Sequence, residues 1–154
     1  MDFVLWASRV VHGVSVIVWL GGLIYFNAVA RPITEHHRAT RSTLSVEILR
    51  RFQSFIWSSV WPLMFTGLLL MLLSPRFVWF DYSTSWARLL AVKQVALLLL
   101  FFFAWQMGKV GRKLQGEIEG EQFDGWWMAY TKLVKRSILV GIVALLSAAG
   151  MMVV

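Results

Sequence analysis

The sequence contains no cysteine. Without thiolates the chain has no means to form disulfides, cysteine-based zinc sites, iron–sulfur clusters or the covalent attachment of a c-type haem. The sequence also shows no nucleophile–base pair, phosphate-binding glycine loop or carboxylate dyad, so hydrolysis and phosphoryl transfer have no visible apparatus. Whether the chain is an enzyme stays open at this point, and a redox or accessory protein is expected rather than a stand-alone enzyme.

Charged residues are scarce as well. Only 15% of the residues are charged, whereas 58% are hydrophobic, and the mean hydropathy is +0.67. This balance, together with recurring long apolar runs, is typical of integral membrane proteins. Nine tryptophans and eleven phenylalanines fit aromatic belts at the two surfaces of a lipid bilayer.

Four apolar segments each approach the ~20 residues that a helix needs to cross ~30 Å of hydrocarbon. They predict an all-α bundle of four transmembrane helices, forming a single domain over residues 1–154, at about 3–30, 52–74, 86–108 and 129–154. Proline predicts the end of the first helix at Arg31-Pro32 and of the second at Pro75-Arg76. The N-terminus lacks the pattern of a cleaved secretory signal, so we interpret it as the start of the first helix.

The net charge of +7 comes from basic residues that flank the apolar segments, so nucleic acid is not expected as a partner. Eleven basic residues lie after the first and third segments: Arg31, Arg38, Arg41, Arg50, Arg51, Lys109, Arg112, Lys113, Lys132, Lys135 and Arg136. Only Arg76 and Arg88 lie in the second connection. By the positive-inside rule both termini are expected outside, on the periplasmic face of a bacterial-type inner membrane.

Two ionisable side chains, His12 and Lys93, fall inside the predicted spans. His12 lies nine residues beyond Phe3, or ~13 Å, and Lys93 lies seven residues beyond Trp86, or ~10 Å. Both are therefore expected at a similar depth in the outer half of the bundle. Ionisable groups at membrane depth mark functional or paired sites.

Small and aromatic residues follow His12 at helical spacing. The spacing i, i+3, i+7 and i+10 assigns to one helix face His12, Ser15, Trp19 and Gly22. Gly21 and Gly22 remove side-chain bulk on or beside that face, which would let a helix or a flat macrocycle approach closely. The plainer alternatives are that His12 hydrogen-bonds across helices, that Lys93 extends to the interface, and that the glycines only pack helices.

Haem b is the cofactor that this set of residues favours. It needs an axial nitrogen, an apolar slot and charged partners for its propionates. His12 would supply the nitrogen, and Arg9, one turn outward, or Arg88 would reach the propionates.

The second axial position is open between Lys93, a methionine such as Met64 or Met71, and no ligand. A second histidine is not expected there, because His36 and His37 fall in the first connection.

Copper is the alternative cofactor. Cu(I) favours thioether and imidazole ligands. Met64 and Met71 are seven residues apart on one face of the second helix, and either could join His12 at a copper site. Methionine in an apolar helix is more often a packing residue.

Several short motifs resemble the small membrane proteins of the copper-resistance D (CopD-like) family. They are His12 followed by WLGG at 19–22, ARP at 30–32, RRF at 50–52, WSSVW at 57–61, TGLLLM at 66–71, and Lys93 in the third helix. The resemblance extends to the HemJ-type protoporphyrinogen oxidases, four-helix proteins that carry haem b, and implies that His12 and Lys93 correspond to their haem-associated residues. The stretch YFNAVARPITEHH departs from the pattern of those oxidases, which favours the CopD-like label.

The sequence therefore predicts a membrane b-type haem protein with His12 as an iron ligand, passing electrons to a quinone or a larger membrane redox complex. The alternatives are a copper transport or resistance protein, a structural accessory subunit and a porphyrinogen oxidase.

Overall fold

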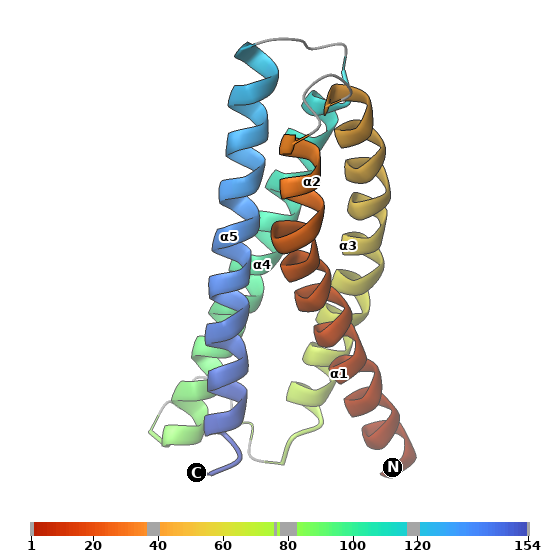
Figure 1. The fold of residues 1–154 in the computed structure, drawn as a ribbon. Helices are drawn as coiled ribbons and strands as arrows, with labels where there is room; N and C mark the ends of the chain where they lie inside the picture. The colour runs from red at the N-terminus through yellow and green to blue at the C-terminus, as the bar shows by residue number, and fades with distance from the viewer. Residues whose placement is uncertain (1, 37–40, 76, 78–82, 117–120, 154) are drawn as a thin grey trace.

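The computed structural model describes residues 2–36, 41–75, 77, 83–116 and 121–153, and all its regular elements are helical. The elements are α1 (Asp2–Tyr25), η1 (Phe26–Ala30), α2 (Arg31–His36), α3 (Arg41–Leu72), α4 (Ser85–Leu114) and α5 (Glu121–Gly150). Four continuous helical segments are long and apolar enough to cross a membrane, which confirms the all-α four-helix membrane bundle. Both termini lie at one end of this elongated bundle (Figure 1).

The first helix does not end at Arg31-Pro32, as predicted, but continues to His36. The chain passes through one π-helical turn, in which the N–H of Arg31 donates to the carbonyl of Phe26. A π turn changes the local hydrogen-bond register, and Pro32 then occupies the first turn of α2, where a missing N–H is tolerated. An ion pair of 2.8 Å between Arg31 and Glu35 supports this added turn.

The other helices also extend beyond the predicted spans of 52–74, 86–108 and 129–154. α3 begins eleven residues earlier than expected, α4 continues six residues further, and α5 begins eight residues earlier and ends at Gly150. Apolar runs mark only the part of a helix within the hydrocarbon, and turns with charged residues extend α3 and α5 at their starts and α4 at its end. Arg38, His37 and Arg76 lie outside the described residues.

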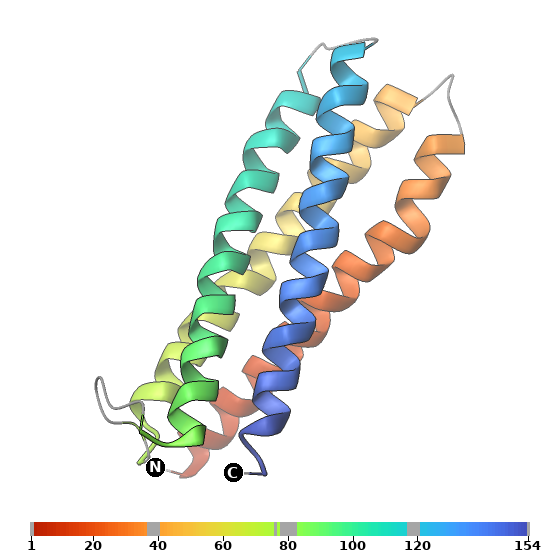
Figure 2. The same cartoon turned by 90° about the vertical axis from the view of Figure 1, so that its left-hand side faces the viewer.

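The helices form two pairs, α1 with α3 and α4 with α5, which meet most closely at the end of the bundle that holds α2 (Figures 1 and 2). We call the half of the bundle at this end the α2 half and the other, which holds both termini, the N/C half. Phe26 lies at the centre of an aromatic core in the α2 half. Its ring centroid is 4.7 Å from Phe52, 5.5 Å from Tyr130 and 6.0 Å from Trp127.

Candidate functional site

A cavity of about 470 Å³ occupies the N/C half of the bundle. All four long helices contribute to its wall, which is mostly aliphatic. The side chains that carry chemistry come from α1, α3, α4 and α5: His12, Trp19, Met71, Lys93, Gln94 and Met151. Its volume lies within the range of ~300–1,000 Å³ found for small-molecule and cofactor sites.

His12 is held against α3 by a hydrogen bond of 3.0 Å between its Nδ1 and the hydroxyl oxygen of Thr66. The Thr66 hydroxyl has one hydrogen, and its bond of 2.6 Å to the carbonyl of Pro62 uses that hydrogen. Thr66 therefore accepts from His12, whose Nδ1 must carry the proton. This tautomer leaves Nε2 with a free lone pair, the form in which histidine ligates a metal.

Gly67, the next residue along α3, makes room for the imidazole. A Cβ atom at this position would lie 3.2 Å from His12 Cε1 and 3.7 Å from Nδ1. A side chain at this position would therefore press against the His12 ring, which would have to move by a few tenths of an ångström. Sequence reasoning singled out Thr66 and Gly67 only as part of the TGLLLM motif. The depth of Thr66 could have indicated that it lies near His12. Thr66 lies six residues, or ~9 Å, from the end of α3, which is similar to the depth expected for His12.

Lys93 of α4 lines the same cavity as His12 and is close enough to interact with it electrostatically. The structure thus brings together the two ionisable residues that the sequence assigned to one depth. Neither a hydrogen bond nor an ion pair of Lys93 is found in the described part of the chain. An amine in so apolar a space attracts an anionic group.

The two methionines proposed as alternative ligands have different surroundings. Met71 lines the cavity, and its sulfur accepts a hydrogen bond from the side-chain amide of Gln94. Met64 does not line the cavity and packs against the hydrophobic core. Met151, at the end of α5, lines the cavity as well.

Trp19 is a buried aromatic residue in the wall of the cavity. Its indole is 3% exposed and packs on Gly141 of α5, where a Cβ atom would lie 2.9 Å from the ring. The indole N–H of Trp19 has no partner among the described residues. Trp19 therefore belongs both to the cavity wall and to the hydrophobic core that includes Phe26 and Tyr130.

Gly21 and Gly22 do not line the cavity, contrary to the expectation that they form a wall beside His12. At ~100° per residue Trp19 lies only ~20° around the helix from His12, whereas Gly22 lies ~80° away and Gly21 on the opposite side. Both glycines instead line a second groove, between α1 and α3.

The two arginines proposed as propionate partners also differ. Arg9 lines a small groove of about 240 Å³ next to the cavity, and the two spaces share Leu70 and Ser74. Arg88 does not line the cavity, and its guanidinium lies 3.5 Å from the Ser85 hydroxyl on the exposed start of α4. Arg9 is therefore the better placed of the two.

Within the described residues, no three or more histidine, aspartate or glutamate side chains gather as a metal site. A bare metal ion in the cavity would have to draw on His12, Met71 and neutral or cationic neighbours. Haem differs, because the porphyrin itself supplies four ligands to the iron and the protein needs to add only one or two.

Comparison of the chain with protein-family models, with curated proteins and with solved structures found no match. The resemblance to the CopD-like family accordingly stays a prediction.

Proposed function

We propose that this membrane protein binds haem b in the cavity of the N/C half, with His12 as an axial ligand of the iron. The observation that carries the proposal is the hydrogen bond from His12 Nδ1 to Thr66, because it frees Nε2 beside an apolar cavity. A metal-ligating histidine characteristically donates its other N–H to such a partner, which orients the ring and raises its basicity.

The walls of the cavity fit a group with a flat apolar body and an anionic edge. Aliphatic side chains and Trp19 would contact the body, and Lys93 and Arg9 would pair with the carboxylates. Met71 lines the cavity and would be available as a second ligand of the iron; Lys93, which also lines it, would serve there only as a neutral amine and in place of its role toward a carboxylate. Arg88 and Met64 would not contact haem bound in this way, because neither lines the cavity.

Bound haem would supply one-electron redox chemistry, and we propose that a quinone or a larger membrane redox complex is the electron partner. The protein itself would hold the haem, balance the charge of its carboxylates and keep water away from it. The His12 ring is held against α3 by its hydrogen bond to Thr66, Lys93 would contribute a positive charge, and Trp19 would contact the bound group.

Haem titration of the purified protein tests the proposal. We expect saturation at about one haem per chain, and loss of binding in His12→Ala. His36→Ala is the matched control, because His36 ends α2 and does not line the cavity. No saturable binding, or equal binding by His12→Ala, would overturn the proposal.

Copper binding is the second candidate, favoured by one observation: Met71 and Met151 line the same cavity as His12. This candidate predicts stoichiometric Cu(I) that is lost in both His12→Ala and Met71→Leu. Metal analysis of protein purified with added Cu(I) decides it, with Met64→Leu as the control, since Met64 packs against the core and does not line the cavity.

We also propose that both termini face the outside of a bacterial-type inner membrane, on the strength of the basic residues around α3, α4 and α5 at the α2 end. The absence of native cysteine makes single-cysteine labelling free of background. Met152→Cys should react with an impermeant maleimide in intact cells, and Gln122→Cys only after permeabilisation. The reverse pattern would contradict this orientation.

A further inference from the structure

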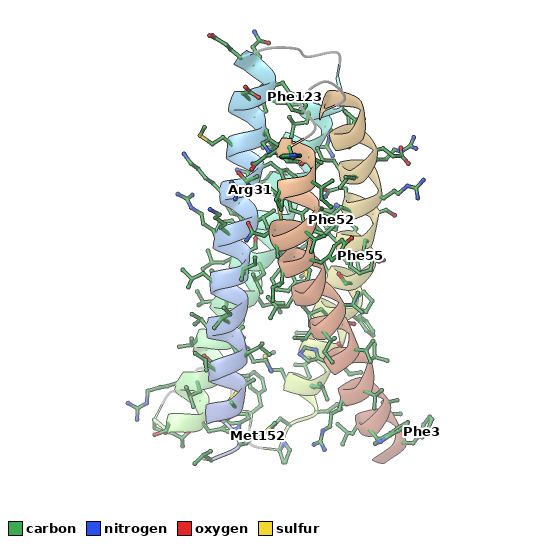
Figure 3. The ribbon with its side chains drawn as sticks, viewed as in Figure 1. Phe3, Arg31, Phe52, Phe55, Phe123 and Met152 are labelled. Carbon is green, nitrogen blue, oxygen red and sulfur yellow. The ribbon has the colours of Figure 1, made fainter. Side chains whose placement is uncertain are left out.

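A second groove, of about 600 Å³, runs along the outside of the α1–α3 pair. Gly21, Gly22 and Tyr25 form part of one wall, and Phe52 and Phe55 project from α3 to form the other (Figure 3). The groove does not include His12 or Lys93, and Ile17 is the one lining residue that it shares with the cavity.

The two adjacent glycines have different consequences for the shape of the groove. A Cβ atom on Gly22 would lie 2.6 Å from Phe55 Cε1, so Gly22 lets the Phe55 ring pack onto α1. A Cβ atom on Gly21 would meet nothing within 4 Å, so the missing side chain of Gly21 leaves open space on the surface. The open space at Gly21, which we call the notch, therefore lies beside the Phe55 ring.

The groove is somewhat longer than the hydrocarbon of one bilayer leaflet is thick. It extends along the first helix from Ile17 to Ala30, which is ~20 Å at 1.5 Å per residue. One leaflet contributes about half of the ~30 Å hydrocarbon core. A single acyl chain laid along the helix would therefore fit within it.

Positive charge lies toward the α2 end of the groove. Arg51 lines the groove, its side chain is 82% exposed, and its Nε donates to Glu47 at 2.7 Å. Arg50 donates to the other oxygen of the same carboxylate. One carboxylate between two guanidinium groups leaves a net positive charge, and the terminal nitrogens of Arg51 remain as donors for an anion.

We propose that the groove binds an anionic phospholipid, with its phosphate on Arg51 and an acyl chain over Gly21. A transmembrane helix is the less fitting occupant, because close helix approach needs small residues on the contact face and the Phe55 ring covers Gly22. The open space over Gly21 would accept an acyl chain, and the Arg51 guanidinium would bind the phosphate of an anionic phospholipid.

Native mass spectrometry of the full chain, with added phosphatidylglycerol or phosphatidylcholine, tests this site. We expect a preference for phosphatidylglycerol of about fivefold, the effect of one interfacial arginine. Arg51→Gln should abolish the preference. Arg50→Gln should keep it, because Arg50 shares Glu47 but does not line the groove.

Gly21→Leu should lower the binding of both lipids by filling the notch, while circular dichroism stays unchanged. Gly125→Leu is the control, since a Cβ atom there also meets nothing within 4 Å and Gly125 lies on another helix. Equal binding of the two lipids by the native chain, or undiminished binding by Gly21→Leu, would overturn the proposal. A loss of self-association in Gly21→Leu with lipid binding intact would overturn it in favour of a helix contact.

Discussion

The two halves of the bundle are packed in different ways. In the α2 half, Phe26 is 1% exposed and is surrounded by three further aromatic rings, and Tyr130 is fully buried. In the N/C half the four helices surround a cavity that exposes His12 and Lys93 to a common space. This difference fits the proposed function, in which the α2 half stabilises the bundle and the N/C half would bind the ligand.

The largest effect should come from removing the centre of the aromatic core. Phe26→Ala should lower the free energy of unfolding by about 3–5 kcal/mol, because the surrounding rings cannot close the gap. Leu70→Ala should cost much less, since it enlarges a cavity that already exists. Thermal unfolding in detergent measures both, and equal losses would erase the distinction between the halves.

A second comparison uses two small residues one turn apart on α5. Gly141→Leu should destabilise the bundle by about 1–3 kcal/mol, because the new side chain would meet Trp19. Ala144→Leu extends into the cavity and should leave the unfolding temperature nearly unchanged while haem binding is lost. The cavity would have no role in binding if Ala144→Leu took up haem like the native chain.

A smaller effect is expected from the partner of His12. Thr66→Val keeps the shape of the side chain and removes the hydroxyl that accepts from Nδ1. We expect haem affinity to fall by about tenfold or more, as for other outer-shell partners, with little change in fold. Ser59→Ala on the same helix is the control, because its hydroxyl bonds only to the backbone carbonyls of α3. Unchanged affinity in Thr66→Val would mean that Thr66 does not orient the ring.

The smallest loss of stability is expected from a substitution in α2, the helical turn that extends the first helix. Glu35→Gln breaks the ion pair with Arg31, and the pair is partly exposed, so the loss should stay below about 1 kcal/mol. The side-chain oxygen of the Gln can still accept a hydrogen bond from the Trp127 indole N–H, which in the native chain donates to Glu35 at 3.3 Å. If Glu35→Gln lowered the free energy of unfolding as much as Phe26→Ala, α2 and not the aromatic core would be the main source of stability in this half.

Hydropathy was sufficient to predict the helices of the membrane bundle, and depth along two helices was sufficient to pair His12 with Lys93. The rotation of each helix about its axis was harder to predict. For this reason helical spacing predicts Gly22 on the His12 face and Gly21 on or beside it, whereas both line the groove between α1 and α3, and spacing gives no indication that Thr66 is the partner of His12. The end of the first helix was wrong for a local reason, because a π turn before Pro32 has no clear sequence signal.

The most direct test of the account is the visible absorption spectrum of purified His12→Gly, recorded with and without added imidazole. If His12 ligates haem iron, the native chain shows a Soret band, His12→Gly loses it, and imidazole entering the vacated space restores it. Retention of the full band by His12→Gly, or no band in the native chain purified from haem-replete cells, would contradict the central claim.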